Sequence, residues 1–271
     1  MEPRRHERNT SFEWRSPTGS RRVLTESQAA QWDRDGYFLL RGALDATVVE
    51  ALRGALDPFE ERTTEWLRSQ GGSALIADAE AITFTTHLVT RSPVARAFAS
   101  DPVFSGLCGD VVGPDVRLYW DQAVYKKPEP VREFPWHQDN GYAYVEPQQY
   151  LTCWVPLVDA TVENGCPWVV PGLHLLGTLR HWWTPAGFQC VTDPEGAVPV
   201  EARAGDVVVF SSLTPHRTGP NTSSSVRKAY ILQYAPDGAV AYRGDAAEPE
   251  AQDDPDRQFP VRRGGRTATG S

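Results

Sequence analysis

From Asp115 onward the sequence changes to short apolar runs separated by Gly, Pro and Asn turns, and this pattern constrains the fold more than any other feature. The runs cover residues 117–127, 150–158, 167–170, 207–212 and 226–234. In the first run Leu118, Gln122 and Val124 share one face, as alternate residues of a strand do. Because short strands joined directly by turns pair antiparallel, we expect a β sandwich or barrel over residues 114–240.

Residues 24–113 carry helix signals instead, including the segment 80–113. Four residues are placed to cap a helix: Thr25, Asp45, Ser92 and Asp101. Thr25 and Gln28 match a capping box, and the proline that follows Ser92 and Asp101 is favoured in a first helical turn. A strand is expected between the first two helices, at residues 36–42. We therefore expect an α-rich N-terminal layer around a mainly β core.

Both ends of the chain lack an apolar period. Residues 1–23 are polar and basic, which predicts a flexible arm. Residues 241–271 are rich in Asp, Glu, Arg and Gly, which predicts a disordered tail. The residues between them, 24–240, are expected to form a single domain.

Charge and hydropathy narrow the class of partner. The formal net charge of -8 argues against nucleic acid or an anionic membrane as a partner. No apolar run reaches membrane-spanning length, and the basic residues near the N-terminus are not followed by the apolar segment of an export signal. We expect a cytoplasmic protein that binds a small-molecule substrate, and its oligomeric state is left open.

Residues 134–140 offer two metal ligands, His137 and Asp139. On an extended strand these side chains point to the same face, so an imidazole and a carboxylate can converge on one ion. With a second histidine they would make the facial triad that holds Fe(II) and leaves positions open for oxygen chemistry. The pair alone is weak evidence, because a His-x-Asp sequence often arises by chance.

His216 is the candidate for the third ligand. It stands just after the buried run 207–212, where a barrel strand ends and its side chains face the mouth. His174 and His181 lie in loops and could also reach a pocket, but neither ends a strand that faces the pair. His87 is expected to be an ordinary core or surface histidine.

Arg227 lies inside an apolar strand, where its charge must be paired. The partner could be a structural Asp or Glu. It could also be the distal carboxylate of a dicarboxylate co-substrate, which a planar guanidinium grips with two hydrogen bonds. An Fe(II) with three protein ligands has three places left, enough for a 2-oxo acid to bind through two oxygens and for O2 to take the last. 2-Oxoglutarate would satisfy both the iron and Arg227.

Several linked motifs occur in one order along the chain: Asp35-Gly36-Tyr37, Lys127-Pro128, Pro135-Trp136-His137-Gln138-Asp139, residues 163–174 and residues 205–210, followed by His216 and Arg227. Together they resemble the phytanoyl-CoA dioxygenase family of iron and 2-oxoglutarate oxygenases, over residues 25–236. The resemblance implies a double-stranded β-helix, a jelly-roll or cupin-like barrel, which agrees with the β runs.

The resemblance also implies roles for single residues. It makes His137, Asp139 and His216 the Fe(II) ligands and catalytic centre, and it makes Arg227 the anchor of 2-oxoglutarate. Thr218 would place a hydroxyl near the same carboxylate, Trp154 would line the co-substrate pocket, and Gln122 would be a polar contact there. The alternatives are an ordinary turn threonine at 218 and plain barrel packing at 154 and 122.

The function implied is oxidation of a small organic substrate, a natural product or other small metabolite, with release of succinate and CO2. The reaction could be hydroxylation, desaturation or rearrangement, and the presence of Asp139 favours these over halogenation. Five aromatic residues are candidates for the mouth of the pocket: Tyr142, Tyr144, Trp182, Trp183 and Phe188. Two alternatives stay open: a metal-binding barrel without turnover, and an acyl-CoA hydroxylase of lipid catabolism.

Overall fold

The computed structural model describes residues 2–244 and 246–268. Its α-helices are α1 (Glu26–Asp35), α2 (Ala46–Ser69), α3 (Pro93–Ala99) and α4 (Pro102–Val111). Their expected caps at Thr25, Asp45, Ser92 and Asp101 are confirmed, and Thr25 forms the complete capping box with Gln28. Three short 3-10 helices also occur: η1 (Leu88–Thr90), η2 (Asp139–Gly141) and η3 (Leu173–Leu176). No helix among the described residues is long and apolar enough to cross a membrane.

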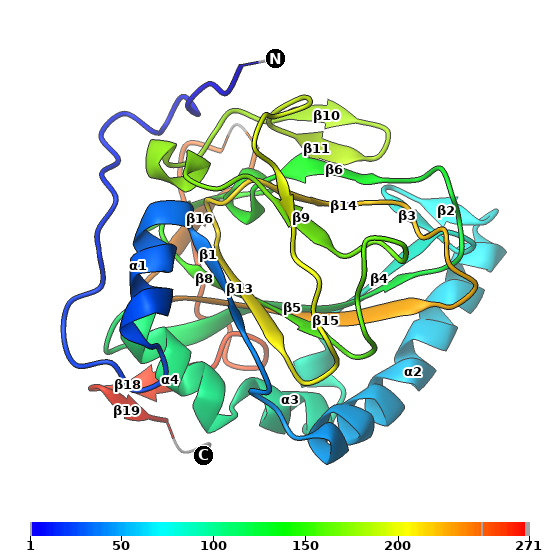
Figure 1. Ribbon diagram of the computed structural model, residues 1–271, viewed down its shortest axis with the longest axis horizontal. Helices are drawn as coiled ribbons and strands as arrows, with labels where there is room; N and C mark the ends of the chain where they lie inside the picture. The colour runs from blue at the N-terminus through cyan, green and yellow to red at the C-terminus, as the bar shows by residue number, and fades with distance from the viewer. Residues whose placement is uncertain (1, 245, 269–271) are drawn as a thin grey trace.

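The larger sheet is antiparallel and forms one wall of the barrel (Figure 1). Its strands run in the order β1 (Tyr37–Leu40), β13 (Val207–Ser211), β8 (Leu151–Pro156), β15 (Arg227–Pro236), β5 (Val116–Lys126), β4 (Ile82–Thr86), β3 (Ala77–Asp78) and β2 (Ser73–Ala74). β18 (Pro260–Arg263) pairs with β5 and with β19 (Arg266–Thr267). The helices border this sheet, along the left and lower parts of the figure.

The second wall is a smaller sheet, in the order β12 (Val198–Pro199), β9 (Pro167–Val169), β14 (His216–Thr218) and β6 (Phe134–His137). Two further sheets lie beside it. One is the hairpin of β10 (Trp182–Thr184) and β11 (Gly187–Gln189), and the other joins β17 (Glu250–Ala251), β16 (Val240–Tyr242) and β7 (Tyr144–Glu146).

Strand alternation separates two apolar cores. Val208 and Phe210 of β13 pack inside the barrel with Val169 of the smaller sheet. Val207 and Val209 of the same strand belong to the core under the helices. Because successive residues of a strand point to opposite faces, one continuous apolar run serves both layers. The expected jelly-roll fold with an N-terminal helical layer is confirmed.

The helix signals over 80–113 were wrong for residues 82–86. These residues form β4, which pairs with β5 along its whole length. Its sequence Ile-Thr-Phe-Thr-Thr is rich in β-branched residues, which pack well on a pleated surface. The N-terminal part therefore contributes a strand to the barrel as well as helices.

The predictions of a flexible arm and a disordered tail were wrong for residues that the structure packs against the barrel. In the arm Asn9 is 3% exposed and donates to the carbonyls of Leu176 and Thr178. In the tail Val261 is buried in the core under the helices, within β18. Backbone pairing with distant residues also anchors both segments, since β18 pairs with β5 and the N–H of His6 donates to the carbonyl of Thr178. Such pairing leaves no apolar period in the local sequence. The assignment of 24–240 as one domain stays a prediction.

Candidate metal centre and co-substrate pocket

Two strands and a short helix bring His137, Asp139 and His216 together. His137 ends β6 and lies opposite His216, the first residue of β14. Gln138 is extended, with φ -106° and ψ 146°, so Asp139 points to the same side as His137. The Oδ1 atom of Asp139 is 4.0 Å from Nε2 of His137 and 3.7 Å from Nε2 of His216. The three ligand atoms lie within 4.8 Å of one another, so a single ion can bind all of them.

Backbone carbonyls fix the tautomer of both histidines. The Nδ1 atom of His137 lies 2.8 Å from the carbonyl oxygen of Pro135, and that of His216 lies 3.0 Å from the carbonyl oxygen of Thr214. Because a carbonyl only accepts, each Nδ1 carries the proton and each Nε2 is left free as a ligand. Burial lowers the pKa of His137 to about 3 and that of His216 to about 4, which keeps both rings neutral.

Asp139 is a largely buried carboxylate, with 10% of its side chain exposed. Its Oδ2 atom accepts a hydrogen bond from the hydroxyl of Thr152 in β8. Burial raises the pKa of Asp139, although His137 and hydrogen bonds from Thr152 and Gln233 act in the opposite direction. Two neutral imidazoles and one carboxylate are a donor set that suits Fe(II). Sequence reasoning missed Thr152, although a hydroxyl in the apolar run 150–158 was a usable signal.

Arg227 is 1% exposed and has no acidic partner among the described residues. Its Nη1 atom donates to the carbonyl of Val124 at 3.1 Å, whereas Nε and Nη2 are buried without a partner. Its guanidinium carbon lies 5.4 Å from the ring centre of Trp154. Burial lowers the pKa of Arg227 to about 10. Nε and Nη2 form the edge of a guanidinium that grips a carboxylate side-on, so the free edge fits the distal carboxylate of 2-oxoglutarate.

One pocket between the two sheets contains all seven residues singled out from the sequence. His137, Asp139 and His216 line it together with Arg227, Thr218, Trp154 and Gln122. The rest of its wall is apolar: Ile82, Phe84, Val124, Phe134, Pro167, Phe210 and Ile231. Ile82 and Phe84 were missed because their segment was expected to be helical.

The chain resembles known proteins over most of its length. The phytanoyl-CoA dioxygenase family model matches residues 32–229. A relative from Bos taurus, phytanoyl-CoA dioxygenase domain-containing protein 1, is 25% identical over 77% of this chain and 89% of its own. The chain belongs to the phytanoyl-CoA dioxygenase family.

Two solved structures resemble this family member. The non-haem α-ketoglutarate-dependent carbocyclase SnoK from nogalamycin biosynthesis has a TM-score of 0.65 and 25% identity, covering 84% of this chain and 91% of its own. The epimerase SnoN, in complex with Fe3+, α-ketoglutarate and nogalamycin RO, has a TM-score of 0.65 and 24% identity, covering 90% of this chain and 95% of its own. The protein is a dioxygenase of this family whose cofactors and co-substrates are iron, 2-oxoglutarate and O2.

The other histidines of this phytanoyl-CoA dioxygenase family protein lie outside the metal cluster. His181 accepts from the backbone N–H of Gln138 at 2.9 Å through Nε2, and its Nδ1 lies 2.8 Å from the carbonyl oxygen of Leu179. His174 packs against Trp14 and Gly36. His87 packs against the ring of Trp120. Both nitrogens of His181 are occupied, so it supports the ligand loop rather than the ion.

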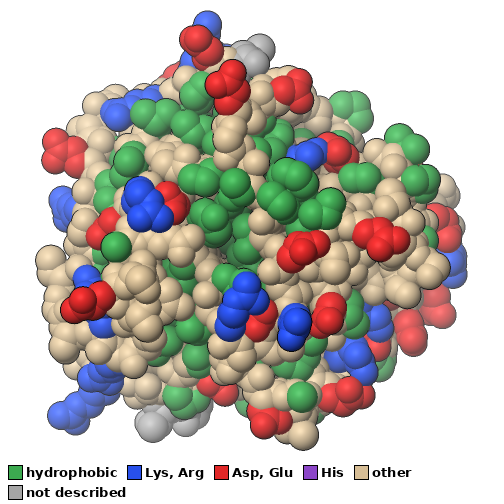
Figure 2. All heavy atoms as spheres, in the orientation of Figure 1, with side chains coloured by type: hydrophobic (Ala, Val, Ile, Leu, Met, Phe, Trp, Pro, Cys, Tyr) green, Lys and Arg blue, Asp and Glu red, His purple; other side chains and the backbone are tan. Residues whose placement is uncertain are grey.

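Three of the five aromatic residues proposed for the mouth form a row that starts at the metal site. The ring of Tyr142 lies 5.6 Å from that of His137, Phe188 lies 5.3 Å from Tyr142, and Trp183 lies 5.2 Å from Phe188. Tyr142 and Trp183 are exposed. Tyr144 lies elsewhere, stacked on His6. In the view of Figure 2 hydrophobic side chains gather around a hollow near the centre of the molecule.

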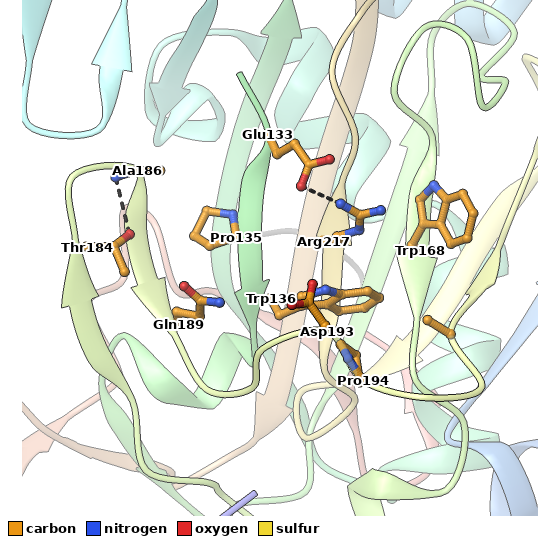
Figure 3. A pocket seen from close by; sticks show the side chains of 11 residues that line it. Glu133, Pro135, Trp136, Trp168, Thr184, Ala186, Gln189, Asp193, Pro194 and Arg217 are labelled. Atoms are coloured by element: carbon orange, nitrogen blue, oxygen red, sulfur yellow. Dashed lines mark hydrogen bonds and ion pairs between the residues drawn. The ribbon is translucent and has the colours of Figure 1, made fainter. Parts of the chain in front are cut away.

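A second pocket lies on the outer face of the smaller sheet (Figure 3). Arg217 follows His216 and precedes Thr218, so its side chain points away from the metal. There it pairs with Glu133 and lies over the rings of Trp136 and Trp168, at 5.3 and 5.4 Å. This outer arginine is a useful control for Arg227.

Proposed function

We propose that the protein oxidises a small organic substrate, a natural product or other small metabolite, at an Fe(II) held by His137, Asp139 and His216. We further propose that Arg227 anchors 2-oxoglutarate. The observation that carries both proposals is the pocket itself, in which two neutral histidines and a carboxylate share the lining with a buried arginine that has two N–H groups without a partner.

With iron and 2-oxoglutarate held by these residues, O2 would be the oxidant: 2-oxoglutarate would give two electrons and end as succinate and CO2, and the substrate would give the other two. The protein's residues contribute placement. The carbonyls of Pro135 and Thr214 orient the two imidazoles, and Thr152 orients Asp139. The apolar wall excludes water from the reacting centre.

Asp139 supports oxygen transfer, desaturation or rearrangement rather than halogenation. A carboxylate in the ligand set fills a position that a halide would otherwise need. We therefore propose a hydroxylase-type reaction, with Thr218, Trp154 and Gln122 shaping the co-substrate end of the pocket.

The row Tyr142, Phe188 and Trp183 favours an apolar, ring-containing substrate. The origin of SnoK and SnoN in nogalamycin biosynthesis supports a natural product. The acyl-CoA alternative is less favoured, because the chain has three lysines and a net charge of -8 and shows no evident cradle for CoA phosphates. A cytoplasmic location, and the absence of nucleic acid and membrane partners, stay predictions.

The test is an anaerobic titration of the protein with Fe(II) and then 2-oxoglutarate, followed by the visible charge-transfer band of the chelated 2-oxo acid. We expect the band in the native protein and in Arg217→Ala, and a weakened band in Arg227→Ala and His216→Ala. If iron binds but the native protein gives no band, the co-substrate assignment fails. The metal-binding barrel without turnover is then the better hypothesis.

A further inference from the structure

Lys126 is a buried lysine that the proposed function leaves unused. It ends β5 and is 1% exposed, and its side chain follows Gln122 and Val124 on the strand face that lines the pocket. In the sheet it lies opposite Ile82 of β4 on one side and opposite Arg227 of β15 on the other. Both neighbours line the pocket, so Lys126 stands at the end of the pocket that holds Arg227.

The ammonium group of Lys126 holds the end of β14. Its Nζ atom donates to the carbonyl of Thr218 at 3.2 Å and to the carbonyl of Gly219, and it lies 3.4 Å from the Thr218 hydroxyl. Thr218 lines the pocket two residues after His216. Lys126 thus contacts both the backbone and the hydroxyl of Thr218.

Lys126 and Arg227 are two buried basic side chains on adjacent strands. Among the described residues neither has a carboxylate oxygen within 4.0 Å, and two N–H groups of Arg227 have no acceptor at all. Buried charges without a counter-ion are costly. An anion at this end of the pocket would lower that cost for both residues.

We propose that Lys126 is a positioning residue of the co-substrate site, which orients Thr218 and adds a second positive charge beside Arg227 for the distal carboxylate of 2-oxoglutarate. This inference rests on the proposed function, since it requires that Arg227 holds that carboxylate. Lys126 and Arg227 would then together recognise the distal carboxylate of 2-oxoglutarate.

The environment of Lys126 leads us to expect that it takes up a proton when 2-oxoglutarate binds. Burial, and then Arg227, lower the pKa of Lys126 to about 7, against the opposing effect of Glu133 and Glu129, while Arg132 lowers it further. Ile82 of β4 and Thr218 of β14 do not titrate, and burial raises the pKa of the Cys166 thiol, which lies near Arg227, to about 11. A bound carboxylate favours the ammonium form. At pH 8, therefore, binding of 2-oxoglutarate should draw a proton onto Lys126.

The experiment compares 2-oxoglutarate with 2-oxovalerate, which has the same chain length but no distal carboxylate. Both are titrated anaerobically into the Fe(II)-loaded protein, with the charge-transfer band as the readout. In Lys126→Met we expect the Kd of 2-oxoglutarate to rise about ten-fold or more, with the Kd of 2-oxovalerate unchanged. Lys126→Arg should restore part of the preference. Lys228→Met is the matched control, because Lys228 follows Arg227 but pairs with Asp57.

A calorimetric titration of the native protein at pH 8, in buffers of different ionisation enthalpy, tests the same inference without a substitution. We expect more proton uptake with 2-oxoglutarate than with 2-oxovalerate. If the native protein prefers 2-oxoglutarate but shows equal proton uptake, and Lys126→Met keeps the preference, the role of Lys126 is refuted and that of Arg227 stands. If the native protein does not prefer 2-oxoglutarate, the proposed function fails as well.

Discussion

At the scale of single residues, the metal centre depends on side chains that do not touch the ion. Thr152 of β8 donates to Asp139, and it lies opposite Gln233 of β15 in the sheet. Such a partner holds the carboxylate in one orientation and shares its charge. The apolar strands β8 and β15 each contribute one polar residue at this point, and both serve the same ligand.

Replacement of Thr152 by valine should therefore weaken iron binding while the fold persists. Valine keeps the shape of threonine but leaves Oδ2 of Asp139 without this donor. We expect the Kd for Fe(II) to rise about 10- to 100-fold, measured by anaerobic titration. The control is Thr85→Val, because the Thr85 hydroxyl bonds to Thr63 away from the metal. Equal iron affinity in both variants would show that Thr152 does not support the ligand.

At the scale of elements, η2 carries Asp139 and is held from outside the barrel by His181. The ring of His181 accepts from Gln138, between the two ligands, and it packs directly on Gly141. A Cβ atom at 141 would lie 2.1 Å from the imidazole ring, far inside van der Waals contact. The absence of a side chain at this position lets the ligand loop and its support approach closely.

Gly141→Ala should therefore displace either His181 or η2 and loosen the metal site. We expect weaker Fe(II) binding and a weaker charge-transfer band with 2-oxoglutarate, with a loss of about 1–3 kcal/mol in the free energy of unfolding. Gly54→Ala is the control, because a Cβ there meets nothing within 4 Å and alanine is favoured in a helix. Iron binding like that of the native protein in Gly141→Ala would contradict the support role of His181.

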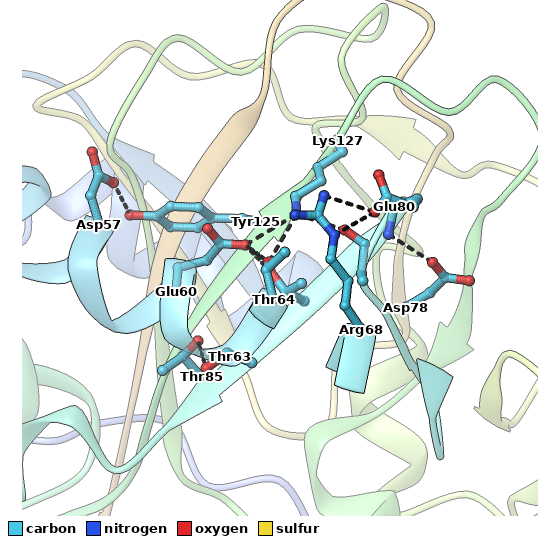
Figure 4. A network of polar contacts seen from close by, with 12 residues as sticks. Asp57, Glu60, Thr63, Thr64, Arg68, Asp78, Glu80, Thr85, Tyr125 and Lys127 are labelled. Atoms are coloured by element: carbon cyan, nitrogen blue, oxygen red, sulfur yellow. Dashed lines mark hydrogen bonds and ion pairs between the residues drawn. The ribbon is translucent and has the colours of Figure 1, made fainter. Parts of the chain in front are cut away.

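A buried polar network joins α2 to the barrel strands (Figure 4). Glu60 is 8% exposed, and it accepts from the hydroxyls of Thr64 and Thr83 and pairs with Lys127 at 3.6 Å. This contact ties the helix to β4 and to the end of β5, next to Lys126. The helical layer is thus connected to the strands of the co-substrate pocket by hydrogen bonds as well as by apolar packing.

Glu60→Ala should lower the free energy of unfolding, mainly through the loss of polar partners rather than of buried apolar area. The change leaves the Lys127 ammonium and the Thr83 hydroxyl without an acidic partner, at a cost of about 3–5 kcal/mol. Urea denaturation measures this free energy of unfolding. Glu61→Ala, at an exposed neighbouring site, should change it by less than about 0.5 kcal/mol. The double variant Glu60→Leu with Lys127→Met should recover part of the loss, and a loss as large as in Glu60→Ala would argue against a paired role.

At the scale of the whole molecule, the parts with a strong local signal were predictable from the sequence. The caps at Thr25 and Asp45 and the strand alternation around Gln122 depend on neighbours along the chain. The roles of Ile82, Thr152 and Val261 depend on residues far away in sequence, such as Lys126, Asp139 and the core under the helices. Where the predictions were wrong, the structure of the segment is determined by contacts with residues distant in sequence.

Buried histidines also make the stability of the whole protein depend on pH. Burial lowers the pKa of His174 and His216 to about 4 and that of His137 and His181 to about 3, from an ordinary value of 6.5. Below pH 6.5 the unfolded chain therefore binds more protons than the folded one, so stability falls as pH drops from about 6.5 to about 4. Each such histidine should lower the free energy of unfolding by about 2 kcal/mol when the pH drops from 7 to 5.

Urea denaturation of the metal-free protein at pH 7 and pH 5 should show this loss. His181→Asn should reduce the dependence on pH, because it removes one of the four titrating groups. Proton competition at the two ligand imidazoles should not weaken the stabilisation by Fe(II) between pH 7 and pH 5, because the pKa values of about 3 for His137 and about 4 for His216 keep both rings neutral in the folded protein at either pH. An equal free energy of unfolding at both pH values would mean that the histidines are not held neutral by burial. If the free energy of unfolding depends on pH as strongly in His181→Asn as in the native protein, other groups cause the dependence. The His181 ring of the native protein would then be protonated at little cost.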